Sequence, residues 1–312
     1  MKINLKVILL VIICAIIFYS IMILVADVPK IQEQIKNFEI SYLPVIMSLI
    51  GLGWIFAFFR WHLLVKNLGF KVPIRSNFTI FFTSMALGMT PGRVGDLVKS
   101  QMFKSRHDIS RTKTAPLVIL ERYYDLIGAI IVAGPGLLYF EPAIYIMGII
   151  SIFVIIGFVV SSSKTLFEKF FTKINRFKLT KRFVEPLSDS YDVIHTSTRG
   201  KISIVSILLS CGHWLVVCFA VYFILLAYDV NTVSILEIIP IYLSSVVLGA
   251  ISFIPGGLGV AEGSLAGFLN LLVDDISITF SLSLIIRILA FWTSVMVGFI
   301  FLRSLKDLFV KK

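Results

Sequence analysis

Long hydrophobic runs separated by short polar stretches make up most of this chain, and their lengths predict a membrane protein. A helix needs about 20 apolar residues to cross the hydrocarbon core of a bilayer. Windows of that length predict about seven spans. The windows are Leu5–Ala26, Tyr42–Phe59, Leu117–Phe140, Ala143–Ser161, Ile202–Tyr228, Leu236–Phe253 and Ile278–Leu302. Two shorter runs, Phe78–Met89 and Ser264–Val273, are not expected to cross alone. The expected fold is all-α, a polytopic bundle of transmembrane helices.

The first run follows Lys2 and Lys6 and extends from Val7 to Ala26. Its length matches a full crossing, and its end, ILVAD, lacks the small residue that a signal-peptidase site has three positions before the cut. We therefore expect an uncleaved first helix.

Basic residues on both sides of the first short run indicate a re-entrant hairpin, because Lys and Arg collect in cytoplasmic loops. The flanking residues are Arg60, Lys66, Lys71 and Arg75 before the run, and Arg93, Lys99, Lys104, Arg106, Arg111 and Lys113 after it. Residues 78–104 are therefore predicted to enter and leave the membrane on the cytoplasmic side. The basic tail and the N-terminus are also predicted to be cytoplasmic, in a multi-pass protein of the cell membrane.

Acidic residues place a second hairpin on the outer side. Asp274 and Asp275 must lie outside if the last span delivers the tail to the cytoplasm. Residues 236–273 are then predicted to enter and return from the outer face. The chain becomes one membrane domain, residues 1–312, with a first half at 1–163, a cytoplasmic amphipathic linker at 164–201 and a second half at 202–312. The linker sequence KTLFEKFFTKINRFK predicts a helix that anchors on the inner leaflet.

Composition supports this class and excludes others. Hydrophobic residues make up 58% of the chain, too many for a soluble core, and its polar stretches are too short for a separate catalytic domain. The net charge of +11 is attributed to cytoplasmic loops, and no nucleic acid is expected. Cys14, Cys211 and Cys218 lie in apolar runs and are interpreted as packing residues.

The two predicted hairpins share a motif at their apices. The first reads Pro91-Gly92-Arg93-Val94-Gly95-Asp96, and the second reads Pro255-Gly256-Gly257-Leu258-Gly259 with Glu262 shortly after. A single proline-glycine pair marks any turn. Two such breaks, assigned to opposite faces, favour an inverted repeat whose broken helices meet near the membrane midplane around a substrate site.

Helix breaks at Pro91 and Pro255 expose backbone N–H groups, which a membrane tolerates only where they line a polar cavity or bind a ligand. A helix N-terminus beside an arginine favours an anion. We therefore predict that Arg93 and the amides after Gly92 and Gly256 bind a lipid phosphate. Gly95, Lys99, Gly257 and Gly259 complete the predicted head-group site.

Ionisable residues inside apolar sequence predict a charge network. Glu121 and Asp125 share a helix face and repel each other unless a cation intervenes, for which Arg122, Arg93 and Lys99 are candidates. An interfacial anchor is the alternative interpretation. Arg287 needs an acidic partner such as Glu262 or Asp125, and Asp96 joins the network. His213 is interpreted as a hydrogen-bonded packing residue.

These motifs resemble the transmembrane domain of the lysylphosphatidylglycerol synthase family, also called the flippase-like domain family. The resemblance rests on PGRVGD at Pro91–Asp96, ERYYD at Glu121–Asp125, PGGLGVAE at Pro255–Glu262, and Arg287. It departs from the family pattern where Leu87 replaces an asparagine and Asp96 replaces a glutamate, while Lys99 takes the basic position.

The resemblance implies movement of a lipid between leaflets, because the sequence shows no soluble synthase domain that would imply aminoacyl transfer. The expected substrate is an anionic phospholipid or a polyprenyl-phosphate-linked lipid. A membrane-embedded transferase, or a subunit that assists a separate glycosyltransferase or aminoacyltransferase, is the alternative. The sequence shows no catalytic motif, metal-ligand spacing or cofactor motif, and we expect no catalytic residue, metal or cofactor.

Overall fold

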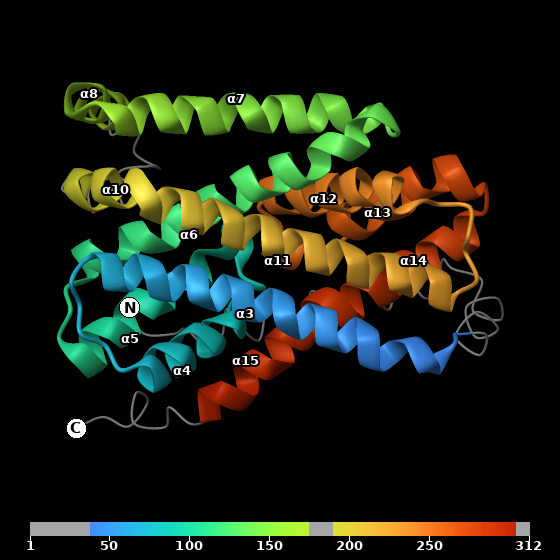
Figure 1. The fold of residues 1–312 in the computed structure, drawn as a ribbon, viewed down its shortest axis with the longest axis horizontal. Coiled ribbons are helices and arrows are strands. Elements are labelled where there is room, and N and C mark those ends of the chain that lie inside the picture. The colour runs from blue at the N-terminus through green and yellow to red at the C-terminus, as the bar shows by residue number, and fades with distance from the viewer. Residues whose placement is uncertain (1–37, 175–189, 304–312) are drawn as a thin grey trace.

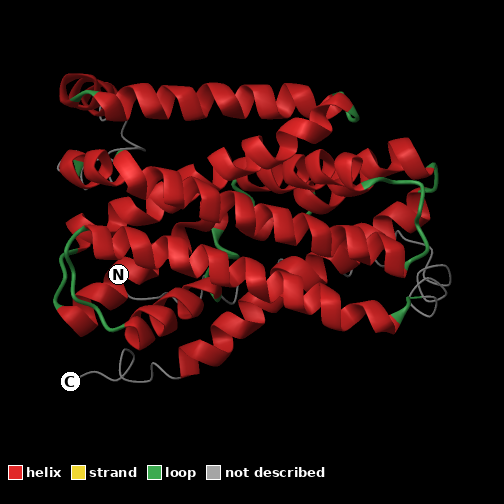
Figure 2. Ribbon diagram, viewed as in Figure 1, coloured by secondary structure: helices red, strands yellow, loops and turns green. Residues whose placement is uncertain are grey.

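The computed structural model describes residues 38–174 and 190–303, and within these ranges the regular structure is helical, with no strand (Figure 2). The predicted first span, Leu5–Ala26, lies outside the described residues, as do residues 175–189 of the linker and the tail from 304. The all-α prediction is confirmed. The helices are η1 (Ile40–Tyr42), α3 (Leu43–Asn67), α4 (Ile74–Met85), η2 (Pro91–Leu97), α5 (Val98–His107), α6 (Arg111–Ala133), η3 (Gly134–Leu138), α7 (Pro142–Ser162), α8 (Lys164–Ile174), α10 (Tyr191–Ser197), α11 (Gly200–Ala227), α12 (Ile235–Ile251), η4 (Pro255–Gly257), α13 (Val260–Val273), α14 (Ile276–Arg287), η5 (Ile288–Trp292) and α15 (Thr293–Arg303).

Five helical segments in the described part of the chain are long and apolar enough to cross a membrane. They are Ile40–Asn67, Pro142–Ser162, Gly200–Ala227, Pro255–Val273 and Ile276–Leu302. The run at Ser264–Val273, which was not expected to cross alone, belongs to a longer helical segment that begins at Pro255 and has 19 residues. The window Leu236–Phe253 corresponds to α12, a shorter apolar helix.

Helices α3 and α11 lie side by side and in close contact (Figure 1). Small residues allow this approach. A Cβ atom at Gly53 would lie 2.9 Å from Val217 Cγ2, and one at Gly128 of α6 would lie 2.7 Å from Ser210 Cβ. Membrane helices rely on van der Waals packing of this kind, because lipid tails are as apolar as leucine side chains.

The chain reverses at η2 and again at η4, and these two turns contact each other. In Figure 1, α4 and α5 lie toward the same end of the molecule as α8 and α10, whereas α12, α13 and α14 lie toward the other end. With a rise of about 1.5 Å per residue, the 12 residues of α4 span roughly 18 Å, less than a bilayer core of about 30 Å. The pairs α4–α5 and α12–α13 therefore lie toward opposite ends of the molecule, and the turns within them, η2 and η4, contact each other.

Charge is divided between these two ends. The loops that join α6 to α7, α11 to α12 and α13 to α14 lie at one end (Figure 1), and their charged residues are Glu141, Asp229, Asp274 and Asp275. Helix ends and loops at the other end are mainly basic. They include Lys66, Lys71, Arg75, Lys104, Arg106, Arg111, Lys113, Lys164, Arg199 and Lys201.

Candidate functional site

A cavity of about 130 Å³ lies where η2, α3, α6, α11, α12 and α14 meet. Most of the charged residues singled out from the sequence line it, together with several aromatic side chains. The charged lining residues are Arg60, Arg93, Asp96, Lys99, Glu121, Arg122, Asp125 and Arg287, and the aromatic ones are Trp54, Phe81, Trp214, Tyr242 and Phe291.

Asp125 lies between two arginines. Its Oδ1 is 2.5 Å from Arg60 Nη1, and its Oδ2 is 2.9 Å from Arg122 Nη1. Arg60 also donates to Ser210 Oγ at 2.6 Å, and the residue is only 1% exposed. The placement of Arg60 in a cytoplasmic flank was therefore wrong, because α3 continues to Asn67 and carries Arg60 into the bundle. The sequence does indicate that the helix continues past Arg60, because mainly apolar residues follow it up to Val65.

Lys99 of α5 forms a buried ion pair with Glu121 of α6. The Lys99 ammonium also lies over the ring of Trp61, 4.4 Å from its centroid, a favourable cation–π arrangement. Trp61 is fixed in turn by a hydrogen bond from Nε1 to Asn77 Oδ1 at 2.8 Å. Glu121 Oε1, the oxygen that does not face Lys99, is buried and accepts no hydrogen bond from the described residues.

Asp96 lies within the first turn, η2, between Arg93 Nε and Arg122 Nη2, each 3.5 Å from its Oδ2. At that distance the charges attract each other, but Oδ2 is buried and receives no hydrogen bond within the described chain. The Asp96 and Glu121 side chains both line the cavity. Asp96 Oδ2 and Glu121 Oε1 therefore have no hydrogen-bond donor among the described residues. Buried acceptors of this kind are stabilised by a hydrogen bond from water or from a ligand.

Thr90 stabilises the first turn. Its carbonyl accepts from Arg93 N at 2.8 Å, and its Oγ1 accepts from Gly95 N at 2.6 Å. Gly95 is required here because a Cβ atom would lie 2.4 Å from Leu87 O. Arg93 has a φ of 54°, a left-handed conformation that costs about 1–2 kcal/mol for a residue with a side chain. The Arg93 side chain is 42% exposed and faces the cavity.

The second turn is closed by its own hydrogen bonds. Gly257 N donates to Ile254 O at 2.9 Å, and Gly259 N donates to Glu262 Oε2 at 2.9 Å. Gly256, Gly257 and Gly259 all have positive φ values, which glycine adopts without strain. The prediction of free amides after Gly256 is therefore wrong, because the acid three residues into α13 reaches back and caps the helix. Likewise, Thr90 occupies the amides of Arg93 and Gly95.

Arg287 connects the second turn to the last span. Its Nε donates to Glu262 Oε1 at 2.9 Å, its Nη2 donates to Gly256 O, and its guanidinium lies 4.2 Å from the centroid of the Phe291 ring. Glu262 is one of the two partners that the sequence suggested. A π-helical segment, η5, follows Arg287, and segments of this kind are frequent at functional sites.

His213 also lines the cavity, and its Nδ1 lies 2.8 Å from Gly53 O. The hydrogen bond agrees with its interpretation as a packing residue between α3 and α11. Cys218 is buried and Cys211 is partly buried, both as free thiols. Within residues 38–174 and 190–303, no three metal-ligating side chains come together as a metal site.

The ion pairs leave one cation in surplus. Five basic side chains line the cavity, and four buried acids, including Glu262 behind Arg287, pair with them. Arg93 is the least engaged of the five, since its one acidic contact is the 3.5 Å approach to Asp96. The arrangement can therefore accept one negative charge without displacing an existing pair.

A helical membrane bundle with a charge-lined cavity beside its first glycine-rich turn is the class of protein that these features define. A family model for the lysylphosphatidylglycerol synthase transmembrane region matches residues 7–298, and the chain belongs to this family. Two relatives from Methanothermobacter thermautotrophicus are each described as a UPF0104 membrane protein. One is 23% identical over 277 residues, covering 82% of this chain and 79% of the relative. The other is 22% identical over 308 residues, covering 90% of each.

Proposed function

We propose that the chain is a flippase-like carrier that moves a lipid with an anionic head group between the leaflets of the cell membrane. The observation that carries this proposal is the surplus cation, Arg93, at a cavity buried in a membrane bundle. Charged groups are expensive inside a bilayer, so a bundle that buries seven of them around one cavity, with Arg93 and Arg122 partly exposed beside them, indicates a polar substrate. A phospholipid or a polyprenyl-phosphate-linked lipid supplies the matching charge.

Two re-entrant hairpins related as an inverted repeat form the framework of the proposed carrier. The contact between η2 and η4, and the approach of their helix pairs from opposite ends, support this arrangement. The mainly basic end is assigned to the cytoplasm by the distribution of Lys and Arg, and both termini are assigned there too. Carriers with broken helices at the midplane expose one site alternately to either side.

Arg93 binds the phosphate in this proposal, while the free oxygens of Asp96 and Glu121 accept hydrogen bonds from head-group hydroxyls or water. Pockets for drug-sized ligands measure about 300–1,000 Å³. The cavity of about 130 Å³ admits a head-group fragment only, so the acyl chains stay in lipid and the helices separate during passage. The second turn, fixed by Glu262 and Arg287, remains in place while the first turn moves.

Liposomes with fluorescent phosphatidylglycerol in both leaflets test the proposal, with an impermeant quencher added outside. The purified protein should make the inner-leaflet lipid accessible. Arg93→Ala should slow this movement roughly tenfold or more, since a charge-assisted contact contributes about 1.5–3 kcal/mol. Lys104→Ala is the matched control, because Lys104 pairs with Asp108 on the surface.

Equal lipid movement by the parent and by Arg93→Ala would refute the assignment of Arg93, and no movement by the parent would refute the carrier. Mass spectrometry of the recovered lipid separates the other functions. A modified head group would identify a membrane transferase. Movement or modification that requires an added glycosyltransferase or aminoacyltransferase would identify an assisting subunit.

A further inference from the structure

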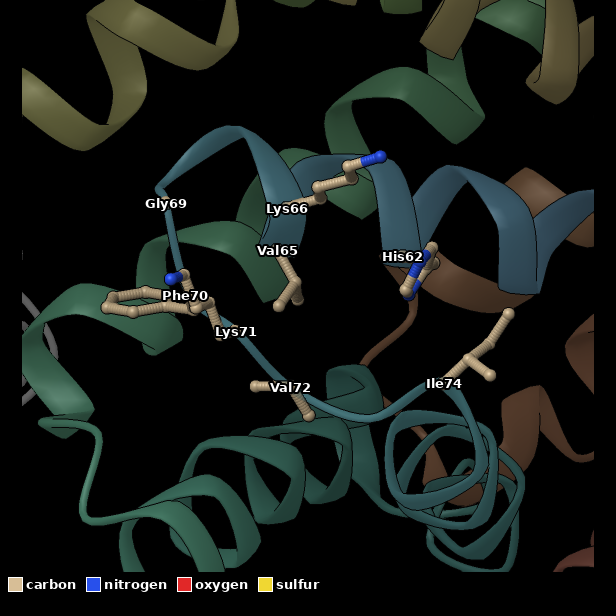
Figure 3. A pocket seen from close by; sticks show the side chains of 8 residues that line it. All are labelled: His62, Val65, Lys66, Gly69, Phe70, Lys71, Val72 and Ile74. Carbon is tan, nitrogen blue, oxygen red and sulfur yellow. The ribbon is translucent and has the colours of Figure 1, made fainter.

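A second and larger cavity lies at the basic end of the bundle, away from the central charge network. It has a volume of about 430 Å³ and is formed where α3 ends and α4 begins (Figure 3). Its walls come from His62, Val65 and Lys66 of α3, from Gly69, Phe70, Lys71 and Val72 of the connecting loop, and from Ile74. The volume falls in the range of about 300–1,000 Å³ that is usual for small-molecule sites.

The loop geometry that makes this cavity follows from the sequence. Gly69 follows the end of α3 with a φ of 78°, and its N–H donates to Lys66 O at 3.0 Å. Phe70 and Val72 then pack against the hydrophobic core, which fixes the loop. Pro73 precedes α4 as its N-cap residue and supplies no side-chain cap, so the first amides of this 12-residue helix, which begins at the lining residue Ile74, have no side-chain acceptor.

Charge at this cavity is of one sign. Lys66 and Lys71 are exposed, and neither forms an ion pair with any described residue. None of the eight lining residues is acidic. In the central cavity, by contrast, nearly every cation has a carboxylate. Unneutralised cations beside an uncapped helix N-terminus favour an anion with several acceptor oxygens.

We propose that this cavity, the α3–α4 pocket, binds a phosphate-bearing anion, namely the head group of a phospholipid at that membrane surface. Lys66 and Lys71 lie on different sides of the pocket (Figure 3), and as exposed side chains they turn toward the phosphate when it binds, while Val65, Val72 and Ile74 contact the glycerol and the first carbons of the chains. The apolar wall and the position at the end of a membrane-spanning helix favour a lipid over a free phosphate ester. The site is separate from the proposed transport site at Arg93.

Binding of short-chain lipid to the purified full-length protein tests the pocket. The probe is dihexanoyl phosphatidylglycerol, titrated into protein that carries Arg93→Ala so that the central cavity does not contribute. Adding Lys66→Gln with Lys71→Gln should weaken binding roughly tenfold or more, because two charge-assisted contacts are lost. Lys104→Gln with Lys113→Gln removes the same charge from the same end of the molecule and should leave the affinity unchanged.

Ile74→Trp is a second variant that keeps both lysines and fills the pocket, and it should also weaken binding. Glycerol 3-phosphate distinguishes the source of the anion. Binding of this probe with the same dependence on Lys66 and Lys71 would replace the lipid by a soluble phosphate ester. Equal lipid affinity of the Lys66→Gln/Lys71→Gln and Lys104→Gln/Lys113→Gln variants would overturn the proposed head-group site. Absence of lipid binding to the Arg93→Ala protein would do the same, and both results leave the carrier proposal intact.

Discussion

At the scale of single residues, the buried acids of the central cluster form ion pairs with basic side chains on another helix or one helical turn away. Glu121 pairs with Lys99, Asp125 pairs with Arg60 and Arg122, and Glu262 pairs with Arg287. A buried pair adds little net stability because desolvation offsets its attraction, but half of a pair is strongly destabilising. The cluster is therefore stable as a set and sensitive to any single loss.

Lys99→Met should reveal this sensitivity. It leaves Glu121 charged at 0% exposure, which should lower the free energy of unfolding by about 3–5 kcal/mol. Adding Glu121→Gln removes the stranded charge and should restore much of the loss. Denaturant unfolding in detergent measures both. A double variant that loses as much as the two single variants together would show that the residues do not interact.

The sequence predicted several of these residues, and its failures have physical causes. Arg287 was expected to pair with Glu262 or Asp125, because an arginine deep in a span requires an acid, and its partner is Glu262. Arg60 was missed because a charge near the end of an apolar window resembles an interfacial residue until its partner is known. The free amides were wrong because pattern alone does not show that Glu262 and Thr90 already accept from them.

At the scale of elements, helices of uniform hydrophobicity were predicted to within two residues at each end. The windows Ala143–Ser161 and Ile202–Tyr228 correspond to α7 at Pro142–Ser162 and α11 at Gly200–Ala227. The window Tyr42–Phe59 ended early, since α3 continues to Asn67. Its last two turns hold polar residues that reduce hydropathy but are stabilised by contacts across the bundle, which no local window detects.

Substitution of Gly298 tests how closely α15 packs against the end of α4. A Cβ atom there would lie 2.1 Å from Ala86 N at the end of α4, so Gly298→Ala must push α15 away from the first hairpin. We expect a loss of about 1–3 kcal/mol in unfolding free energy. Gly267→Ala in α13 is the control. Nothing lies within 4 Å of its Cβ position, and removing a helical glycine should stabilise by up to about 1 kcal/mol.

Thermal unfolding in detergent compares these two glycine variants. Similar melting temperatures for both would mean that α15 and α4 do not pack as closely in solution. Slower lipid movement by Gly298→Ala at unchanged stability would instead connect this contact to the motion of the first hairpin.

At the scale of the whole molecule, charge separates the two ends of the bundle while the turns meet between them. The distribution of charged residues in the sequence predicted that the acidic loops and the mainly basic loops face opposite sides, and the structure has them at opposite ends of the molecule. The contact between η2 and η4 was expected from the repeated proline-glycine motif. Which cation pairs with which acid depends on the packing of helices distant in sequence, and no local pattern specifies it.

Orientation follows from this separation and can be measured with single cysteines. In a protein whose native cysteines are replaced by alanine, Thr232→Cys reports on the acidic end and Lys113→Cys on the basic end, both at exposed positions. A membrane-impermeant maleimide added to intact cells should label Thr232→Cys at once and Lys113→Cys only after permeabilisation, because basic ends face the cytoplasm. Lys71→Cys and Lys104→Cys, on either side of the first hairpin, should behave like Lys113→Cys. Labelling of Lys71→Cys and Lys104→Cys from opposite sides would mean that the segment between them crosses the membrane, and the two-hairpin carrier would have no basis.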